Sequence, residues 1–67
     1  MNITVYNERE KTTLQIEFNG KTVADLLKEL KINPEVFLVI RNNEVIIEDE
    51  IVNENDIIEL LSVVSGG

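Results

Sequence analysis

The chain has 67 residues, which is enough for one small domain and leaves no room for a two-domain enzyme with its own cofactor-binding half. Because it contains no Cys and no His, it has no disulfide, no cysteine–zinc site and none of the commonest general bases. Thirteen acidic residues against six basic ones give a net charge of −7, which disfavours nucleic acid and anionic membranes and favours a partner protein with a basic face.

The N-terminal part of the chain predicts a β-hairpin followed by a turn into a helix. Apolar and polar residues alternate over 3–6 and again over 13–18, and the polar segment 7–11 between them suits a turn. Asn19-Gly20 then marks a strand-to-helix turn.

A single amphipathic helix is predicted to begin at Thr22. Thr22 is a plausible N-cap, and Asp25 stands three residues later, where the acid of a capping box belongs. Pro34 ends the helix. Its apolar residues recur at helical spacing on one face: Val23, Leu26, Leu27 and Leu30.

The C-terminal half predicts three more strands. The apolar run 36–40 reads as a strand that is either buried on both faces or has its second face against a partner. Asn42-Asn43 turns the chain into a short strand over 45–47, and an acidic loop over 48–50 follows, which Ile51 and Val52 are expected to pin to the core. After a turn over 53–56, the last strand is predicted at 57–64.

This order predicts an α+β fold of the β-grasp type, with a mixed sheet of four to five strands and one helix packed across one face. The first and last strands are expected to pair in parallel at the centre, since the helix supplies the crossover. We expect the domain to span 1–64 and a flexible Gly-Gly tail to occupy 65–67.

Catalytic and metal-binding constellations are absent from the sequence. The acidic residues Glu48, Asp49, Glu50, Glu54 and Asp56 lack the central Gly of a calcium loop, so a solvated acidic rim is expected there. We therefore expect no catalytic residue, no metal ligand and no cofactor of its own. The segment Met1–Thr4 has neither the basic start nor the apolar stretch of a signal peptide, so a cytoplasmic location is expected.

The C-terminus carries the most specific signal. Gly66 and Gly67 directly follow a strongly apolar strand. Two glycines make a thin tail that can enter a narrow channel, and a terminal Gly has no side chain to block its carboxylate. This suits a carboxylate that is itself the reacting group in another protein's active site.

In length, element order and the ending Val63-Val64-Ser65-Gly66-Gly67, the chain resembles the ubiquitin-like sulfur carriers, the family of the thiamine-pathway carrier and of the small subunit of molybdopterin synthase. Further similarity lies in the segments 22–27, 40–45 and 54–60. Many relatives have Asp-Gly-Asp before the last strand, whereas this chain has Asn55, which can take the left-handed conformation in place of Gly.

The resemblance implies a specific chemistry at the chain end. An E1-like adenylating enzyme would use ATP to activate the carboxylate of Gly67, and sulfur from a sulfurtransferase would then displace AMP to give a thiocarboxylate. Gly66 would supply reach. The sulfur could be destined for the thiazole of thiamine, for molybdopterin or for thiolated tRNA. The short chain leans toward the thiamine type, with an enzyme such as thiazole synthase as the acceptor.

Two other functions fit the same sequence. A ubiquitin-like modifier would transfer the activated Gly67 to a lysine, and a plain interaction module would not use the tail at all. Both the strand over 36–40 and the last strand carry apolar residues in both alternating sets, so one set must face away from the helix. Such an apolar patch with acids at its rim is typical of a docking surface, although a homodimer or loops could also cover it.

Overall fold

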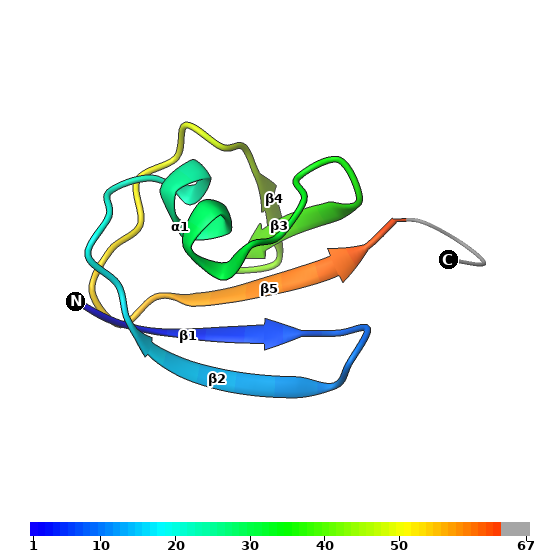
Figure 1. Cartoon of the computed structure of the whole chain (residues 1–67), viewed down its shortest axis with the longest axis horizontal. Helices are drawn as coiled ribbons and strands as arrows, with labels where there is room; N and C mark the ends of the chain where they lie inside the picture. The colour runs from blue at the N-terminus through cyan, green and yellow to red at the C-terminus, as the bar shows by residue number, and fades with distance from the viewer. Residues whose placement is uncertain (64–67) are drawn as a thin grey trace.

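The computed structural model describes residues 1–63 and shows one helix packed on one face of a five-stranded mixed sheet (Figure 1). The predicted end of the last strand, Val64, and the predicted tail 65–67 lie outside the described residues. The elements in chain order are β1 (Asn2–Asn7), β2 (Thr12–Glu17), α1 (Val23–Leu30), β3 (Phe37–Arg41), β4 (Glu44–Ile46) and β5 (Ile57–Ser62).

The sheet has the strand order β2-β1-β5-β3-β4, which confirms the predicted β-grasp arrangement. Strands β1 and β5 are parallel and lie side by side at the centre, with Val5 opposite Ile58. The other pairs, β1–β2, β3–β5 and β3–β4, are antiparallel. The chain crosses from the β1–β2 hairpin to β3 through α1, which covers one sheet face as Figure 1 shows.

The helix begins where the sequence indicates and ends at Leu30, before Pro34. Thr22 is the N-cap, and both halves of the capping box with Asp25 are formed although Asp is shorter than Glu. Lys31 closes the helix in the left-handed conformation, with φ of 57°, and its N–H donates to the carbonyls of Leu27 and Lys28.

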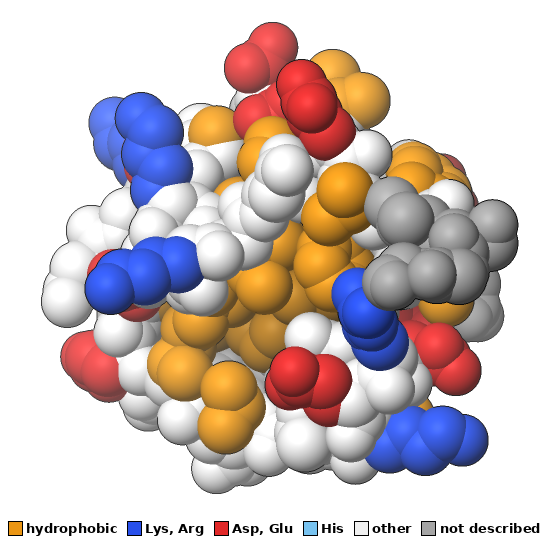
Figure 2. Space-filling model, turned by 45° about the vertical axis from the view of Figure 1, so that its right-hand side comes forward, with side chains coloured by type: hydrophobic (Ala, Val, Ile, Leu, Met, Phe, Trp, Pro, Cys, Tyr) orange, Lys and Arg blue, Asp and Glu red, His pale blue; other side chains and the backbone are white. Residues whose placement is uncertain are grey.

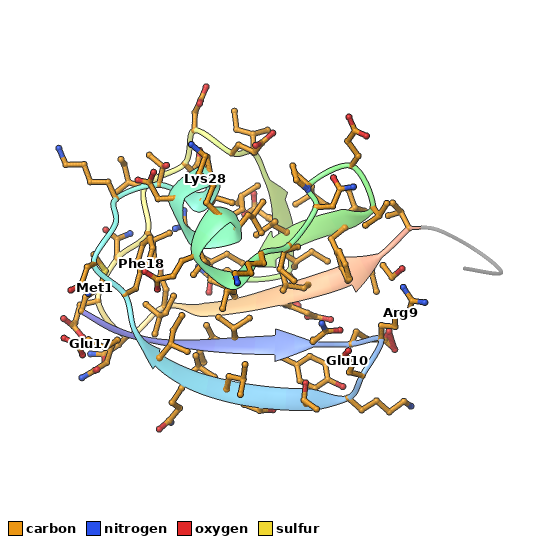
Figure 3. All side chains as sticks on the ribbon, viewed as in Figure 1. Met1, Arg9, Glu10, Glu17, Phe18 and Lys28 are labelled. Carbon is orange, nitrogen blue, oxygen red and sulfur yellow. The ribbon has the colours of Figure 1, made fainter. Side chains whose placement is uncertain are left out.

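The core lies between α1 and the inner sheet face. Phe18 follows β2 and is 1% exposed, and Figure 3 shows its side chain reaching between the helix and the sheet. Its neighbours come from every layer of the fold, and the buried hydrophobic residues are Ile3, Val5, Phe18, Val23, Leu26, Leu27, Val39, Val52, Ile58 and Leu60.

Asparagine and glycine occupy the tight positions of the chain. Asn42 and Asn43 both have positive φ in the β3–β4 turn, and Asn55 has φ of 67°, as its position in place of the usual Gly predicts. At Gly20 the requirement is space, because a Cβ there would lie 2.7 Å from the Cβ of Asp25 and from the Phe18 ring.

Three expectations need correction. The strand expected at 36–40 is β3 over Phe37–Arg41, and the last strand ends at Ser62 within the described residues. Val52 is 1% exposed and does anchor the acidic loop, but the Ile51 side chain is 52% exposed. Ile51 instead contributes its backbone, which forms an isolated bridge with Thr22.

Candidate functional site

The candidate site is the end of β5, from which the chain leads toward its C-terminus. The predicted reactive residues Gly66 and Gly67 lie outside the described residues, so the structure describes the body that carries them. Strand β5 lies between β1 and β3, and the ladder continues past it, because the Val63 N–H donates to the Val36 carbonyl at 2.9 Å. The chain therefore leaves from a strand held on both sides.

Two loops lie at the same end of the molecule. The β1–β2 turn approaches β5 through a hydrogen bond of 3.0 Å from the Glu8 N–H to the Leu60 carbonyl, and it carries Arg9 and Glu10 (Figure 3). The loop after α1 reaches β5 from the other side through Val36. A partner that receives the chain end must accommodate both loops.

An apolar surface covers the β5–β3–β4 part of the sheet face opposite the helix, with Glu59 lying within it opposite Ile40. Leu38 lies directly opposite Leu61, and Ile40 lies opposite Val45, so these residues share one face. Their neighbours Val39 and Leu60 point to the core and are buried, which settles the side of the sheet. We define the outer apolar face as Leu38, Ile40, Val45, Ile57 and Leu61.

The structure shows which apolar residues of the third and last strands face away from the helix, which the sequence pattern leaves open. Of the two readings for the third strand, burial on both faces is wrong, because Leu38 is 38% exposed. In β5 the buried set is Ile58 and Leu60, and Ile57 and Leu61 point outward. Leu38 and Leu61 lie at the same end as the Ser62 terminus of β5, so the face runs up to the point where the chain leaves the sheet.

The acidic cluster has a structural role that the sequence reading did not assign. Arg41 Nη1 lies 3.0 Å from Asp56 Oδ2 and donates to the Ile51 carbonyl at 2.7 Å, and Nη2 lies 3.0 Å from Glu50 Oε1. Glu54 accepts a hydrogen bond from the Asn2 N–H at 2.7 Å. Three of the acidic residues that were expected to form a solvated rim, Glu50, Glu54 and Asp56, therefore make specific contacts with other parts of the chain. The available signal was Arg41 itself, the last basic residue before the acid-rich segment.

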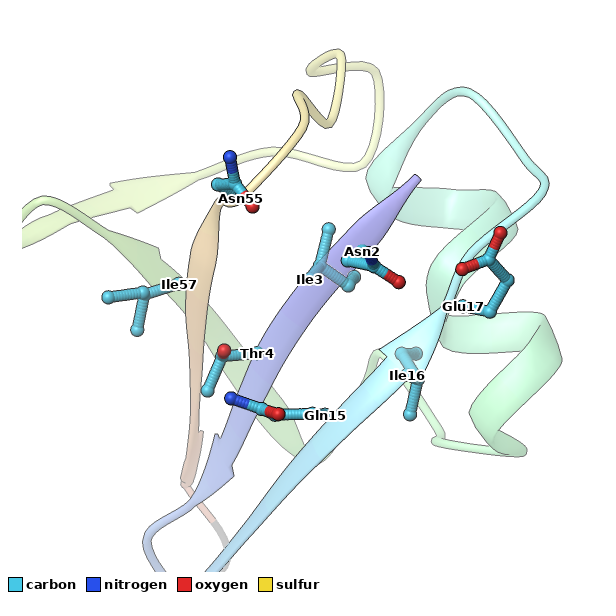
Figure 4. Close-up of a pocket in the computed structure, with 8 residues that line it drawn as sticks. All are labelled: Asn2, Ile3, Thr4, Gln15, Ile16, Glu17, Asn55 and Ile57. Carbon is cyan, nitrogen blue, oxygen red and sulfur yellow. The ribbon is translucent and has the colours of Figure 1, made fainter.

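A cavity lies at the opposite end of the sheet from the Ser62 end of β5. It has a volume of about 580 Å³, and Figure 4 shows side chains of β1, β2 and the start of β5 around it. Its lining is mixed and largely polar, and includes Asn2, Thr4, Gln15, Glu17 and Ile57. Because Ile57 starts β5 and Ser62 ends it, this cavity is about 17 Å from the Ser62 end of β5.

The side-chain chemistry of the described part offers few reactive groups. Within residues 1–63, no group of three or more acidic residues is placed to hold a metal ion. The pKa of Asp25 is lowered by hydrogen bonds from the backbone N–H groups of Lys21 and Thr22. What this arrangement can do chemically is present a chain end on a rigid body beside an apolar face.

None of the helices in the described part is long and apolar enough to cross a membrane.

Comparisons with known proteins agree with this geometry. A model of the ThiS family matches residues 4–67. The chain is 35% identical over 54 residues to the sulfur carrier protein TtuB of Thermus thermophilus. The aligned part covers 79% of this chain and 83% of that protein.

Two solved structures show the same fold. SAMP1 from Haloferax volcanii superposes with a TM-score of 0.75 at 21% identity, covering 100% of both chains. A ubiquitin-like protein from the archaeon Caldiarchaeum subterraneum superposes with a TM-score of 0.65 at 17% identity, covering 98% of this chain and 100% of that one. At these identities the matches establish the β-grasp fold alone.

Proposed function

Because the chain belongs to the ThiS family, a family of ubiquitin-like sulfur carriers, we propose that it carries sulfur as a thiocarboxylate on Gly67. Membership of this family makes the chain a protein-borne carrier on which other enzymes act, and not itself an enzyme. The observation that supports the proposal is the ending Gly66-Gly67, four residues beyond the central strand β5 and inside the segment that the family model matches.

The proposed reaction needs no catalytic side chain from this chain. A carboxylate is a poor electrophile, so an E1-like adenylating enzyme would join an oxygen of Gly67 to the α-phosphorus of ATP and release pyrophosphate. The outer sulfur of a persulfide on a sulfurtransferase would then attack the acyl carbon, and AMP would leave with the oxygen. A thiol of a partner enzyme would cleave the S–S bond of the resulting acyl disulfide, which releases the thiocarboxylate and leaves a disulfide on the partner. The net change replaces one carboxylate oxygen by sulfur.

The outer apolar face is proposed as the docking surface for the adenylating enzyme. It runs to the end of β5 on rigid strands, and its Leu38, Val45 and Ile57 side chains are exposed, whereas Ile40 and Leu61 are half-buried. The net charge of −7 favours a partner with basic residues around an apolar centre. ATP would be bound by that enzyme, and the reaction is proposed to take place in the cytoplasm.

The proposed destination of the sulfur is the thiazole of thiamine, with a thiazole synthase as acceptor. The shortness of the chain supports this choice over the small subunit of molybdopterin synthase.

Intact-mass spectrometry of the protein from its native cells, with alkylation to trap a thiocarboxylate, tests the carrier function. We expect a gain of about 16 Da, one oxygen replaced by sulfur, mapped to Gly67. An unmodified mass together with Gly67–lysine conjugates would instead support a protein modifier. An unmodified mass without conjugates, even with an activating enzyme and ATP supplied, would overturn the proposal.

A substitution in the tail tests how the chain end is used. Gly66→Ala should slow thiocarboxylate formation about 100-fold, because a side chain next to the reacting carbon misplaces it in a narrow channel. Ser65→Ala is the matched control, since it removes bulk one residue earlier and should load normally. Normal loading of Gly66→Ala would contradict the threading role of the tail.

A further inference from the structure

The edge strand β2 is the least buried strand of the sheet. It is the outermost strand on its side, six residues long, and five of its six side chains are exposed. Its Leu14 is 53% exposed on the helix side of the sheet, over a cavity of about 170 Å³ lined by Val5, Leu30, Ile32 and Leu60. Figure 2 shows hydrophobic side chains gathered in a hollow with charged side chains around it.

The backbone of β2 offers hydrogen-bonding groups on its free side. Met1 and Phe18 exchange both of their backbone hydrogen bonds, at 2.9 Å and 2.7 Å. In an antiparallel pair the bonded residues alternate, so Ile16, Leu14 and Thr12 also bond to β1. The N–H and C=O groups of Thr13, Gln15 and Glu17 therefore point away from the sheet. The Thr4 N–H confirms this alternation, since it points to the other side and donates to the Asp56 carbonyl.

This edge lacks the usual protection against strand pairing. Edge strands are commonly guarded by a charge, a proline, a bulge or a very short length. The register of β2 with β1 is continuous over Thr12–Glu17, and Thr12–Ile16 contains no charge and no proline. The opposite edge strand, β4, has only three residues and begins with Glu44.

The charges at the two ends of β2 are opposite. Lys11 precedes the strand and Glu17 ends it. We propose that β2 pairs antiparallel with β2 of a second copy of this chain, with Leu14 opposite its own copy and Thr13 opposite Gln15 of the partner. In this register the outward N–H and C=O groups of Thr13 and Gln15 bond to each other. Lys11, in the turn before β2 with φ of 54°, comes near Glu17 of the other copy, whose carboxylate also lies 3.8 Å from its own N-terminal amine. The twofold axis is perpendicular to the sheet, so both helices lie on one face and the two exposed Leu14 side chains cover each other.

The net charge does not oppose this pairing at the contact. All of the chain's excess acid falls after residue 41, since 42–67 contains seven acidic residues and no Lys or Arg. That part builds β4, the loop after it and β5, which lie beyond β1 from the β2 edge. Over 1–41 the acidic and basic residues balance, with six of each. A second copy that approaches β2 meets the neutral part of the molecule.

The dimer leaves the candidate site free. The outer apolar face lies mainly over β5, β3 and β4, away from the shared edge. The antiparallel arrangement sends the two β5 strands in opposite directions, so each chain end leaves from a different end of the double sheet. The contact of one strand pair is small, so we expect a Kd between about 10 µM and 1 mM.

Sedimentation equilibrium of the full chain from 10 µM to 2 mM tests the dimer. We expect the average mass to rise from 7.6 kDa toward twice that value. Gln15→Pro removes an N–H that points away from β1, so the fold should persist and the protein should stay monomeric, whereas Gln15→Ala should dimerise normally. Far-UV circular dichroism confirms that both variants are folded. A monomer at all concentrations, or a dimer unchanged by Gln15→Pro, overturns the proposal.

A charge exchange tests the proposed register. Lys11→Glu and Glu17→Lys, each alone, should raise the Kd about tenfold, because two attractive pairs become repulsive. An equimolar mixture of the two variants should recover wild-type association, since every pair is then attractive again. Failure of the mixture to recover would rule out this register.

Discussion

At the scale of single residues, the start of the helix is held by one carboxylate. Asp25 Oδ2 accepts hydrogen bonds from the N–H groups of Lys21 and Thr22 at 3.0 and 3.1 Å, and the Asp25 N–H donates to Thr22 Oγ1 at 3.3 Å. These bonds favour the ionised form and lower the pKa of Asp25 below its ordinary value of 3.8. The negative charge also lies in the first turn, where the helix dipole favours it.

This lowered pKa predicts the direction of an acid-dependent loss of stability. Because the pKa is lower in the folded state than in the unfolded state, the contribution of Asp25 is complete above 3.8 and is lost as the pH falls through the folded value. Asp25→Asn lacks this contribution at every pH. The difference in free energy of unfolding between wild type and variant, measured with urea, should therefore be constant from pH 7 to about 5 and shrink below pH 3.8. A difference that stays constant down to pH 2.5 would contradict this role.

At the scale of elements, Arg41 ties the end of β3 to the long connection between β4 and β5. This connection is also bonded to the start of α1, because the Val23 N–H donates to the Glu50 carbonyl and the Val52 N–H donates to the Lys21 carbonyl. The Arg41 side chain is 16% exposed and Asp56 is 18% exposed, so their ion pair is partly shielded from water. Glu50 is 44% exposed, so its pair with Arg41 is weaker.

Removal of the guanidinium should loosen this connection. Arg41→Met keeps the aliphatic bulk but removes the cation beside Asp56, whose Oδ2 keeps only the hydrogen bond from the Asn53 N–H, and it removes the Arg41 donor of the Ile51 carbonyl. We therefore expect a loss of about 1–3 kcal/mol in the free energy of unfolding. The control Glu50→Gln removes only the exposed pair and should cost less than about 1 kcal/mol. Urea denaturation measures both values. Equal costs for the two variants would show that the contacts of Arg41 with Asp56 and with the Ile51 carbonyl contribute nothing to stability.

At the scale of the whole molecule, the two faces of the sheet differ, because the helix covers only one of them. The inner face is buried under α1, whereas the outer apolar face has no cover among the described residues. This face runs to the end of β5, so one partner can contact it and receive the chain end at the same time. The polar cavity at the other end of the sheet adjoins this face, because Ile57 belongs to both.

The docking role of the outer apolar face predicts a specific kinetic effect. With the adenylating enzyme of the proposed reaction, Leu38→Lys should raise the KM for the carrier about tenfold and leave kcat unchanged, because a charge replaces an exposed apolar contact away from the reacting carbon. Ile51→Lys is the matched control, since Ile51 is 52% exposed and lies beside Thr22, far from the chain end. An equal rise in KM for both variants would indicate a general effect of charge and contradict docking at this face.

The sequence by itself determined which elements form and in what order, the start of the helix and the candidate reactive residues. The alternation in β1 and β2, the cap at Thr22 and the left-handed Asn55 all follow from preferences of single residues and their immediate neighbours. The prediction at Gly66 and Gly67 also rests on residue chemistry alone, and it stays a prediction because these residues lie outside the described part.

Only the tertiary structure decided which side chains face the core and which face a partner. In β3 and β5 both alternating sets are apolar, so periodicity carries no information about the face, and the choice depends on pairing with strands that are distant in the chain. The ion pairs of Arg41 with Glu50 and Asp56 also cannot be predicted from the sequence, because they depend on which loop lies beside the end of β3. The exposure of Leu14 cannot be predicted either, because it depends on which strand lies at the edge of the sheet. Local preferences act within a few residues of the chain. Which side chains are exposed depends instead on pairing between strands that are far apart in the chain, such as β1 and β5.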